Sequence, residues 1–257
     1  MTILWHTLLV NPILNLLVVL YSLVGGNMGW AIILLTLITR AILIPAMLPS
    51  LKTMKKQRDI QPQLQKIKEK YKYDKKKQAE EQMKLFKEHG LNPASGCLTQ
   101  IVMLVVLFAL YNVIRTFTDA DVSSINQLFY FDNFKFLADA VINTKFLYLD
   151  LGKPDQIFLL PILGGLVQLI SSKMMQPYVE QGEKLAQKTP DKSDDLAYNM
   201  QNQMLYLMPV MTVLFTFKLP SVIPLYLLVT TIFSVAQQYF VSGWGGMRPL
   251  INKIWKI

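Results

Sequence analysis

The residues of this sequence that could do chemistry are few, and they lie inside apolar stretches. Arg40 belongs to the run ITRAILIPAML, residues 38–48, in which only its threonine neighbour is polar. Placing a guanidinium near the middle of a bilayer costs about 2.5 to 3.5 kcal/mol on insertion scales. Ser50 is about 15 Å away along a helix, so the side chain cannot easily reach the interface. Arg40 is therefore expected to face a hydrated recess or a polar partner.

Away from the ends of the apolar runs, the other polar groups are neutral amides and hydroxyls, and none of these runs contains Asp or Glu. Hydroxyls often hold membrane helices together, which is one interpretation of the threonines. Amide side chains cost more free energy to bury than hydroxyls do, so they favour a position on the wall of a hydrated recess. Together with the arginine they predict a positively charged recess for a polar or anionic guest that passes through transiently. The predicted site residues are Arg40, Gln100, Gln168, Thr231 and Gln237.

Catalytic and metal-binding patterns are absent from the sequence. Cys97 is the single cysteine, and His6 and His89 are far from it and from each other. None of the motifs GxxxxGK[ST], GxSxG or HExxH occurs, so no phosphate cradle, activated serine or zinc-bound water is indicated. We expect neither an enzyme nor a cofactor nor a metal.

The composition predicts an all-α, polytopic membrane protein that positions these residues on spanning helices. Of the 257 residues, 52% are hydrophobic and 17% are charged, whereas soluble domains carry roughly 25% charged residues. A span needs about 20 apolar residues. Five spans are predicted, at residues 27–49, 93–117, 156–176, 203–218 and 221–241.

The charge pattern predicts the orientation of these spans. The net charge of +9 arises mostly from lysines between residues 50 and 92, whereas residues 118–155 are acidic. By the positive-inside tendency, residues 50–92 are cytoplasmic and 118–155 form an extracytoplasmic loop. Residues 177–202 then form a cytoplasmic loop, and 242–257 form a short basic cytoplasmic tail.

Two segments outside the spans have helical periodicity. Within 50–92, Ile60, Leu64, Ile67 and Tyr71, followed by Met83 and Phe86, predict a helical hairpin with its turn at 72–75. Its lysines either form a solvated face that sets topology, or a docking surface for an acidic partner, anionic lipid or ribosomal RNA. In residues 1–26 a polar stripe of Asn11, Asn15 and Ser22 favours an interfacial helix. An extra span or an uncleaved signal are the alternatives.

Several stretches together resemble one family, the YidC/Oxa1/Alb3 membrane protein insertases. They occur in family order and cover almost the whole chain after residue 10: NMGWAIILLTLITRAILIPAML at 27–48, QPQLQKIKEKYKYD at 61–74, MKLFKEHGLNPASGC at 83–97, LPILGGLVQLISSKMM at 160–175 and MPVMTVLFTFKLPSVIPLYLLVTTIFSVAQQY at 208–239. Each motif is weak alone, but their order makes the match specific.

The resemblance implies a five-helix core around a hydrophilic groove, with Arg40 as the groove arginine. Insertases of this family receive the polar flank of a nascent membrane protein in the groove and release its apolar segment into lipid, without nucleotide hydrolysis. The implied location is the bacterial inner membrane, and the implied partners are nascent membrane proteins, the ribosome, the Sec translocon and the lipid bilayer. Sequence-specific nucleic acid is not expected, and a monomer is expected to suffice.

Some positions depart from the family pattern, and two other functions remain open. The family usually has a Pro, a Gln and a Pro where this chain has Thr99, Met103 and Val105, and an aromatic residue and an Asn where it has Leu227 and Thr231. These changes put groove contacts in doubt rather than the fold. The alternatives are a small anionic-solute transporter, against which the lack of an inverted repeat argues, and a membrane-anchored assembly scaffold or chaperone.

Overall fold

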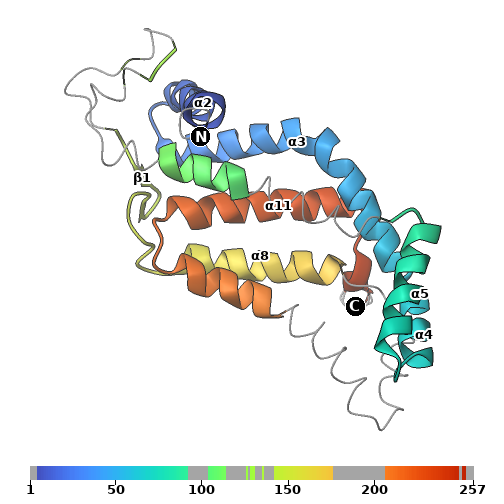
Figure 1. The fold of residues 1–257 in the computed structure, drawn as a ribbon. Coiled ribbons are helices and arrows are strands. Elements are labelled where there is room, and N and C mark those ends of the chain that lie inside the picture. Colours follow the sequence, from blue (N-terminus) through green and yellow to red (C-terminus); the bar gives the residue numbers. More distant parts are fainter. Residues whose placement is uncertain are drawn as a thin grey trace. The chain divides into compact units, whose positions relative to one another are not determined.

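The structure is a computed structural model, and its main elements are helices (Figure 1). It describes residues 5–91, 104–113, 126, 128–130, 135, 142–175, 206–248 and 251–252. The chain divides into two compact units. The first comprises residues 1–43, 100–165 and 211–233, and the second comprises residues 44–99, 166–210 and 234–257. Gln100 and the loop 177–202 lie outside the described residues.

Helices account for most of the described residues, so the all-α prediction is confirmed at this level. The helices are α2 (Asn11–Leu23), α3 (Met28–Asp59), α4 (Gln61–Lys70), α5 (Lys75–Glu88), α8 (Leu159–Met175) and α11 (Val222–Ser242), with further helical segments at 104–113 and 206–216. The described strands, β1 (Lys145–Phe146) and β2 (Leu149–Asp150), form one antiparallel pair. A short π-helix, His6–Val10, precedes α2.

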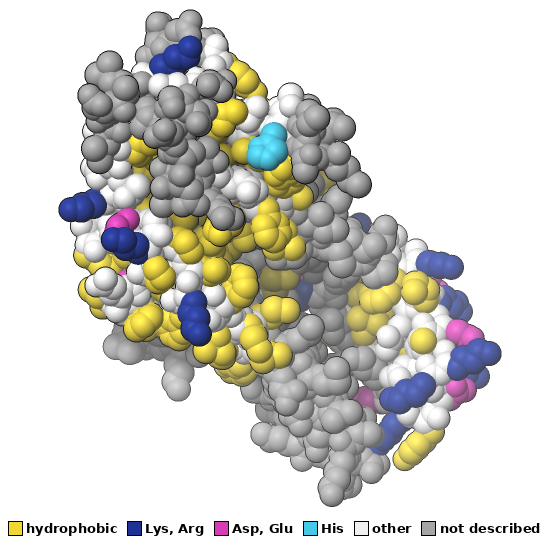
Figure 2. All heavy atoms as spheres, turned by 60° about the vertical axis from the view of Figure 1, so that its left-hand side comes forward, with side chains coloured by type: hydrophobic (Ala, Val, Ile, Leu, Met, Phe, Trp, Pro, Cys, Tyr) yellow, Lys and Arg dark blue, Asp and Glu magenta, His cyan; other side chains and the backbone are white. Residues whose placement is uncertain are grey.

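Among the described residues, two helices are long and apolar enough to cross a membrane. They contain the segments Met28–Thr53 and Val222–Ser242, and three shorter apolar helices, Leu104–Val113, Leu159–Met175 and Tyr206–Thr216, lie within other predicted spans. Large apolar side chains stay exposed on these helices, among them Ile42 at 67% and Phe215 at 66%. Figure 2 shows wide areas of hydrophobic side chains on the surface. Exposed apolar area of this extent is typical of a surface that contacts lipid or another protein. The number of five spans stays a prediction.

Helix α3 is one continuous helix of 32 residues, although it contains Pro45 and Pro49. The sequence predicts a boundary at residue 50, but the helical backbone runs on to Asp59. The chain turns at Ile60, whose φ and ψ are −89° and 0°. Proline removes a backbone donor without forcing an end in an apolar helix whose side chains remain packed. The helical backbone of α3 therefore continues past the predicted span into its polar part.

The basic segment folds as a helical hairpin of α4 and α5 within the second unit. Its small core consists of Ile60, Leu64, Leu85 and Leu91, which are 4% to 8% exposed. Asp74 caps α5 by accepting a hydrogen bond of 3.0 Å from the Lys77 N–H. Met83, which the periodicity assigned to the apolar face, is 49% exposed, because Leu85 occupies that place in the core.

Helix α2 packs its apolar side chains into the core of the first unit. Leu14, Leu17 and Val18 are at most 3% exposed. Asn15 is also buried, at 8% exposure, and its amide donates to the Leu128 carbonyl at 3.0 Å and accepts from the Tyr130 N–H at 2.7 Å. The prediction that Asn15 belongs to an exposed polar stripe is therefore wrong, because its amide forms hydrogen bonds with backbone groups of a loop. The placement of residues 1–26 on or through the membrane stays a prediction.

A compact cap forms where the loop after β2 meets the start of α11, in the first unit. The Ser221 N–H and hydroxyl both donate to the Lys153 carbonyl, at 2.8 and 2.7 Å, and the Val222 N–H donates to the Leu151 carbonyl at 3.2 Å. Asp155, 2% exposed, accepts from the Ile157 and Leu160 N–H groups at 3.0 and 2.8 Å. These bonds tie the acidic loop to the beginnings of α8 and α11.

Gly29 is required by a close approach of β1 to α3. Phe146 lies so close to it that an added Cβ would overlap the phenyl ring, and Trp30 stacks edge-on against the same ring at 5.6 Å. We expect Gly29→Ala to lower the unfolding free energy by about 1 to 3 kcal/mol, the usual range for overpacking. Chemical unfolding in detergent micelles measures the effect. Gly164→Ala is the matched control, because its Cβ meets no atom within 4 Å and the change favours helix.

Tyr148 provides a pH probe of the same cap. Burial, together with its 3.1 Å hydrogen bond to Asp155, raises the pKa of Tyr148 to about 12. A raised pKa means that the stabilisation is complete below the unfolded value near 10 and is lost as the pH rises through 12. The absorbance titration at 295 nm, taken as wild type minus Tyr148→Phe, is expected to show this late transition. In Asp155→Asn the transition should move toward 10, and an unmoved transition would contradict the assignment.

Candidate functional site

Arg40 lies in the first unit, enclosed by side chains of α3 and α11. Its exposed fraction is 4%, and it interacts electrostatically with Tyr226, which is 2% exposed. Thr230, completely buried, lies beside the same phenol. Thr36, 1% exposed, precedes Arg40 by one helical turn and donates to the Ile32 carbonyl at 2.7 Å. The guanidinium thus has hydroxyl-bearing neighbours in an otherwise apolar core.

The sequence of α11 explains how these neighbours reach one place. Tyr226 and Thr230 are four residues apart, and this spacing puts them on one face of a helix. Thr231 is also buried, but its hydroxyl donates to the Leu227 carbonyl one turn earlier, at 2.7 Å. Such a local bond satisfies a hydroxyl within its own helix. Thr230 therefore lies next to the Tyr226 phenol, and the role of Thr231 stays a prediction.

The two predicted amides that the structure describes belong to the second unit. Gln168 lies on α8 and Gln237 on α11, and both are partly buried. The Gln237 Nε2 is buried and makes no hydrogen bond in the described part of the chain. Its neighbour Gln238, 8% exposed, donates to the Ser171 Oγ at 3.1 Å and so joins α11 to α8. Gln238 is thus the glutamine that makes the bond between helices.

Sequence reasoning missed Tyr226 as a site residue. Tyr226 lies within the motif at 208–239, and Thr230 follows it at helical spacing. This spacing is the signal that could have identified the phenol as a site residue. A guanidinium beside a buried phenol and hydroxyls differs from one facing open water. The structure places Arg40 under cover, at 4% exposure, next to Tyr226, which agrees with the polar-partner alternative, and the hydrated recess stays a prediction.

The chemistry of this cluster is electrostatic. A buried cation strongly attracts negative or polar groups, because the surrounding dielectric constant is low. Hydroxyls can donate to or accept from a peptide group that replaces them. Within the described residues, no group of three His, Cys, Asp or Glu side chains could hold a metal ion. The arrangement therefore places a buried cation beside a phenol and hydroxyls.

Comparison with known proteins identifies a family for this chain. A family model described as 60Kd inner membrane protein matches residues 19–245. The membrane protein insertase MisCA of Bacillus subtilis is 30% identical over 243 residues, covering 93% of this chain and 79% of that protein. The insertase YidC of Fusobacterium nucleatum is 34% identical over 221 residues, covering 86% of this chain and 88% of that protein.

A solved structure is also similar. It is the crystal structure of an active YidC insertase with its first transmembrane domain resolved, at 27% identity and a TM-score of 0.57. The match covers 86% of this chain and 43% of that chain, so this chain spans less than half of the solved protein. The family match covers most of the chain, and the apolar helices agree with it; the chain belongs to the 60Kd inner membrane protein family, the YidC/Oxa1 membrane protein insertases.

Proposed function

We propose that this protein inserts membrane proteins by receiving the polar flank of a nascent chain at Arg40 and releasing the apolar segment into lipid. The observation that carries the proposal is an arginine, 4% exposed, beside Tyr226 and Thr230 inside apolar helices. A cation in such a place costs free energy, so its presence there indicates a role in binding or conduction. The names of the relatives support insertion as the process that it serves.

The physical task of an insertase is to lower the barrier for polar groups. Each unsatisfied peptide group in hydrocarbon costs several kcal/mol. A polar recess partway through the bilayer shortens the dry distance that the flank must cross. The apolar segment of the substrate supplies the drive by entering lipid, so the mechanism needs no nucleotide. The membrane potential, about 2.3 kcal/mol per charge per 100 mV, assists acidic groups outward.

Access to Arg40 requires a rearrangement, since Tyr226 and Thr230 cover it. An entering carboxylate or peptide carbonyl takes over the interaction that the Tyr226 phenol makes with the guanidinium. The site then opens for a substrate and closes behind it, which limits leakage. The proposed setting is the bacterial inner membrane with a cytoplasmic C-terminus. The proposed partners are nascent membrane proteins, the ribosome and the Sec translocon, and one copy suffices.

Site-specific photocrosslinking tests the proposal. A photoreactive amino acid at Thr36 or Thr230, both buried beside the cluster, is expected to capture the polar flank of a stalled ribosome-bound nascent membrane protein. The same probe at Ile232, which is 51% exposed on α11, is the matched control and should miss the flank. Capture only from residues 60–91 would support a scaffold instead, and anionic-solute flux in liposomes without flank capture would support a transporter.

A further inference from the structure

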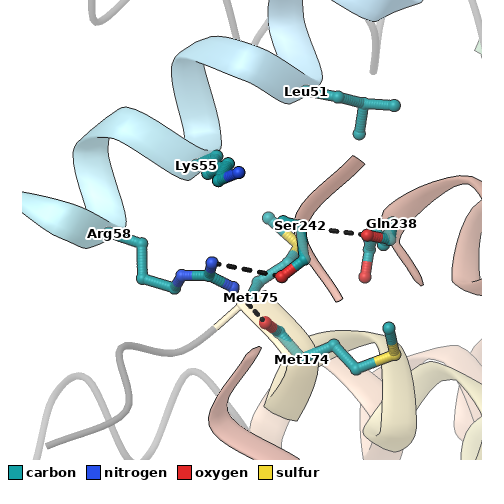
Figure 3. A pocket seen from close by; sticks show the side chains of 7 residues that line it. All are labelled: Leu51, Lys55, Arg58, Met174, Met175, Gln238 and Ser242. Carbon is teal, nitrogen blue, oxygen red and sulfur yellow. Dashed lines mark hydrogen bonds between the residues drawn. The ribbon is translucent and has the colours of Figure 1, made fainter. Parts of the chain in front are cut away.

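A small pocket in the second unit is lined by the end of α3 and by the C-terminal ends of α8 and α11 (Figure 3). Its lining includes Lys55 and Arg58 from α3, Met174 from α8, and Gln238 and Ser242 from α11. Lys55 and Arg58 are three residues apart, so they lie on one face of α3. This face belongs to the polar extension of α3 that leads directly into the hairpin.

Arg58 donates to the ends of two other helices. Its Nη1 donates to the Met174 carbonyl and its Nη2 to the Ser242 carbonyl, each at 3.4 Å. The Lys55 Nζ donates to the Val241 carbonyl, also at 3.4 Å. Carbonyls in the last turn of a helix have no partner inside the helix and carry partial negative charge. Because the last turn of α11 has no basic residue of its own, α3 supplies the cations that this end lacks.

The chain after α11 has a glycine, Gly245, where it approaches the Arg58 guanidinium closely. Gly245 has a φ of +50°, and a Cβ there would overlap the Met174 carbonyl and crowd the Arg58 Nη1. Gly243, with a φ of +64°, donates from its N–H to the Tyr239 carbonyl at 2.8 Å and ends α11. Only a glycine at 245 leaves room for Arg58 against the end of α8. Arg58 and Gly245, which are far apart in sequence, are thus both needed for the contact with the Met174 carbonyl.

We propose that Arg58 is a positioning residue that docks the base of the α4–α5 hairpin onto the ends of α8 and α11 and thereby fixes the direction of the hairpin. Arg58 stands next to the last residue of α3 and two residues before Ile60, where the chain turns into α4. The hairpin core contains only residues 60–91, so that core holds α4 to α5 and leaves the base free to swing. The contacts of Arg58 restrain this joint.

Distance measurements between spin labels test the docking. Labels at Lys84→Cys on α5 and Phe240→Cys on α11, both exposed, are placed in the full chain with Cys97→Ser, in lipid nanodiscs. Wild type is expected to give one narrow distance distribution. Arg58→Gln is expected to add a second, broad population, with the undocked fraction rising about tenfold for the loss of two hydrogen bonds from a charged donor. Arg58→Lys should restore part of the narrow distribution.

Matched variants separate docking from general damage. Lys56→Gln removes the same charge from an exposed position on α3 and should leave the distribution unchanged. Gly245→Ala keeps the charge but displaces the guanidinium, so it should broaden the distribution as Arg58→Gln does, and it decides the question if Arg58→Gln fails to fold. A second label pair, Glu69→Cys and Lys84→Cys within the hairpin, should stay narrow throughout. An unchanged distribution in Gly245→Ala or Arg58→Gln, or broadening of the inner pair, would overturn the proposal.

Discussion

Arg40→Ala is expected to reduce the insertion of substrates with acidic flanks about tenfold, because the loss of even 1.4 kcal/mol of attraction to a carboxylate changes a rate by that factor. Arg40→Met, which keeps most of the side-chain volume, is expected to leave the unfolding free energy unchanged or higher. Replacing a buried charge with an apolar group of similar volume removes a desolvation cost, which often stabilises the fold. A loss of activity without a loss of stability would identify Arg40 as a functional residue.

Conservative variants and altered substrates sharpen this test. Arg40→Met preserves most of the side-chain volume and should behave like Arg40→Ala, whereas Arg40→Lys keeps the charge and should retain most of the activity. Changing the acidic residues of the substrate flank to amides should shrink the difference between wild type and Arg40→Ala. The measurement is protease protection of the translocated flank in reconstituted proteoliposomes. Equal insertion by wild type and Arg40→Ala would remove Arg40 from the mechanism.

The helices and the arginine were predictable because both follow from local composition. Long apolar runs must form helices in lipid, where every backbone group needs an internal partner. A single cation in such a run is visible without knowledge of the fold. The end of α3 was not predictable, since Pro45 and Pro49 are usual stop signals and the helix continues to Asp59. Packing along the helix decides such a boundary, and the sequence shows only its local part.

The neighbours of Arg40 could not be predicted because they depend on tertiary contacts. Polar type alone singled out Thr231 and Gln237, and their neighbours Thr230 and Gln238 have the same type but different environments. Helical phase decides which surroundings each member of a pair meets. Thr230 lies beside the Tyr226 phenol, and Gln238 donates to Ser171. Asn15 shows the same effect, since its loop partners at 128 and 130 are more than a hundred residues away in sequence.

The cap around Asp155 could not be predicted from the sequence either, because the charge pattern shows only that residues 118–155 are acidic. Asp155 is 2% exposed, and it accepts from the Tyr148 hydroxyl at 3.1 Å and from two backbone N–H groups at the start of α8. An aspartate that accepts backbone N–H groups at the start of a helix both caps the helix and stabilises its positive end. The acid therefore organises the loop and α8 together.

Asp155→Ala is expected to lower the unfolding free energy by about 3 kcal/mol, because it leaves two backbone donors without their acceptor and removes a hydrogen bond from a phenol. Asp155→Asn keeps one acceptor oxygen and should cost less. Lys153→Ala is the matched control in the same loop: the ion pair of its side chain with Asp150, at 3.4 Å, joins two partly or largely exposed side chains and should contribute about 1 kcal/mol or less. Denaturant titration in micelles measures all three variants, and equal losses for Asp155→Ala and Lys153→Ala would show that Asp155 does not hold the cap.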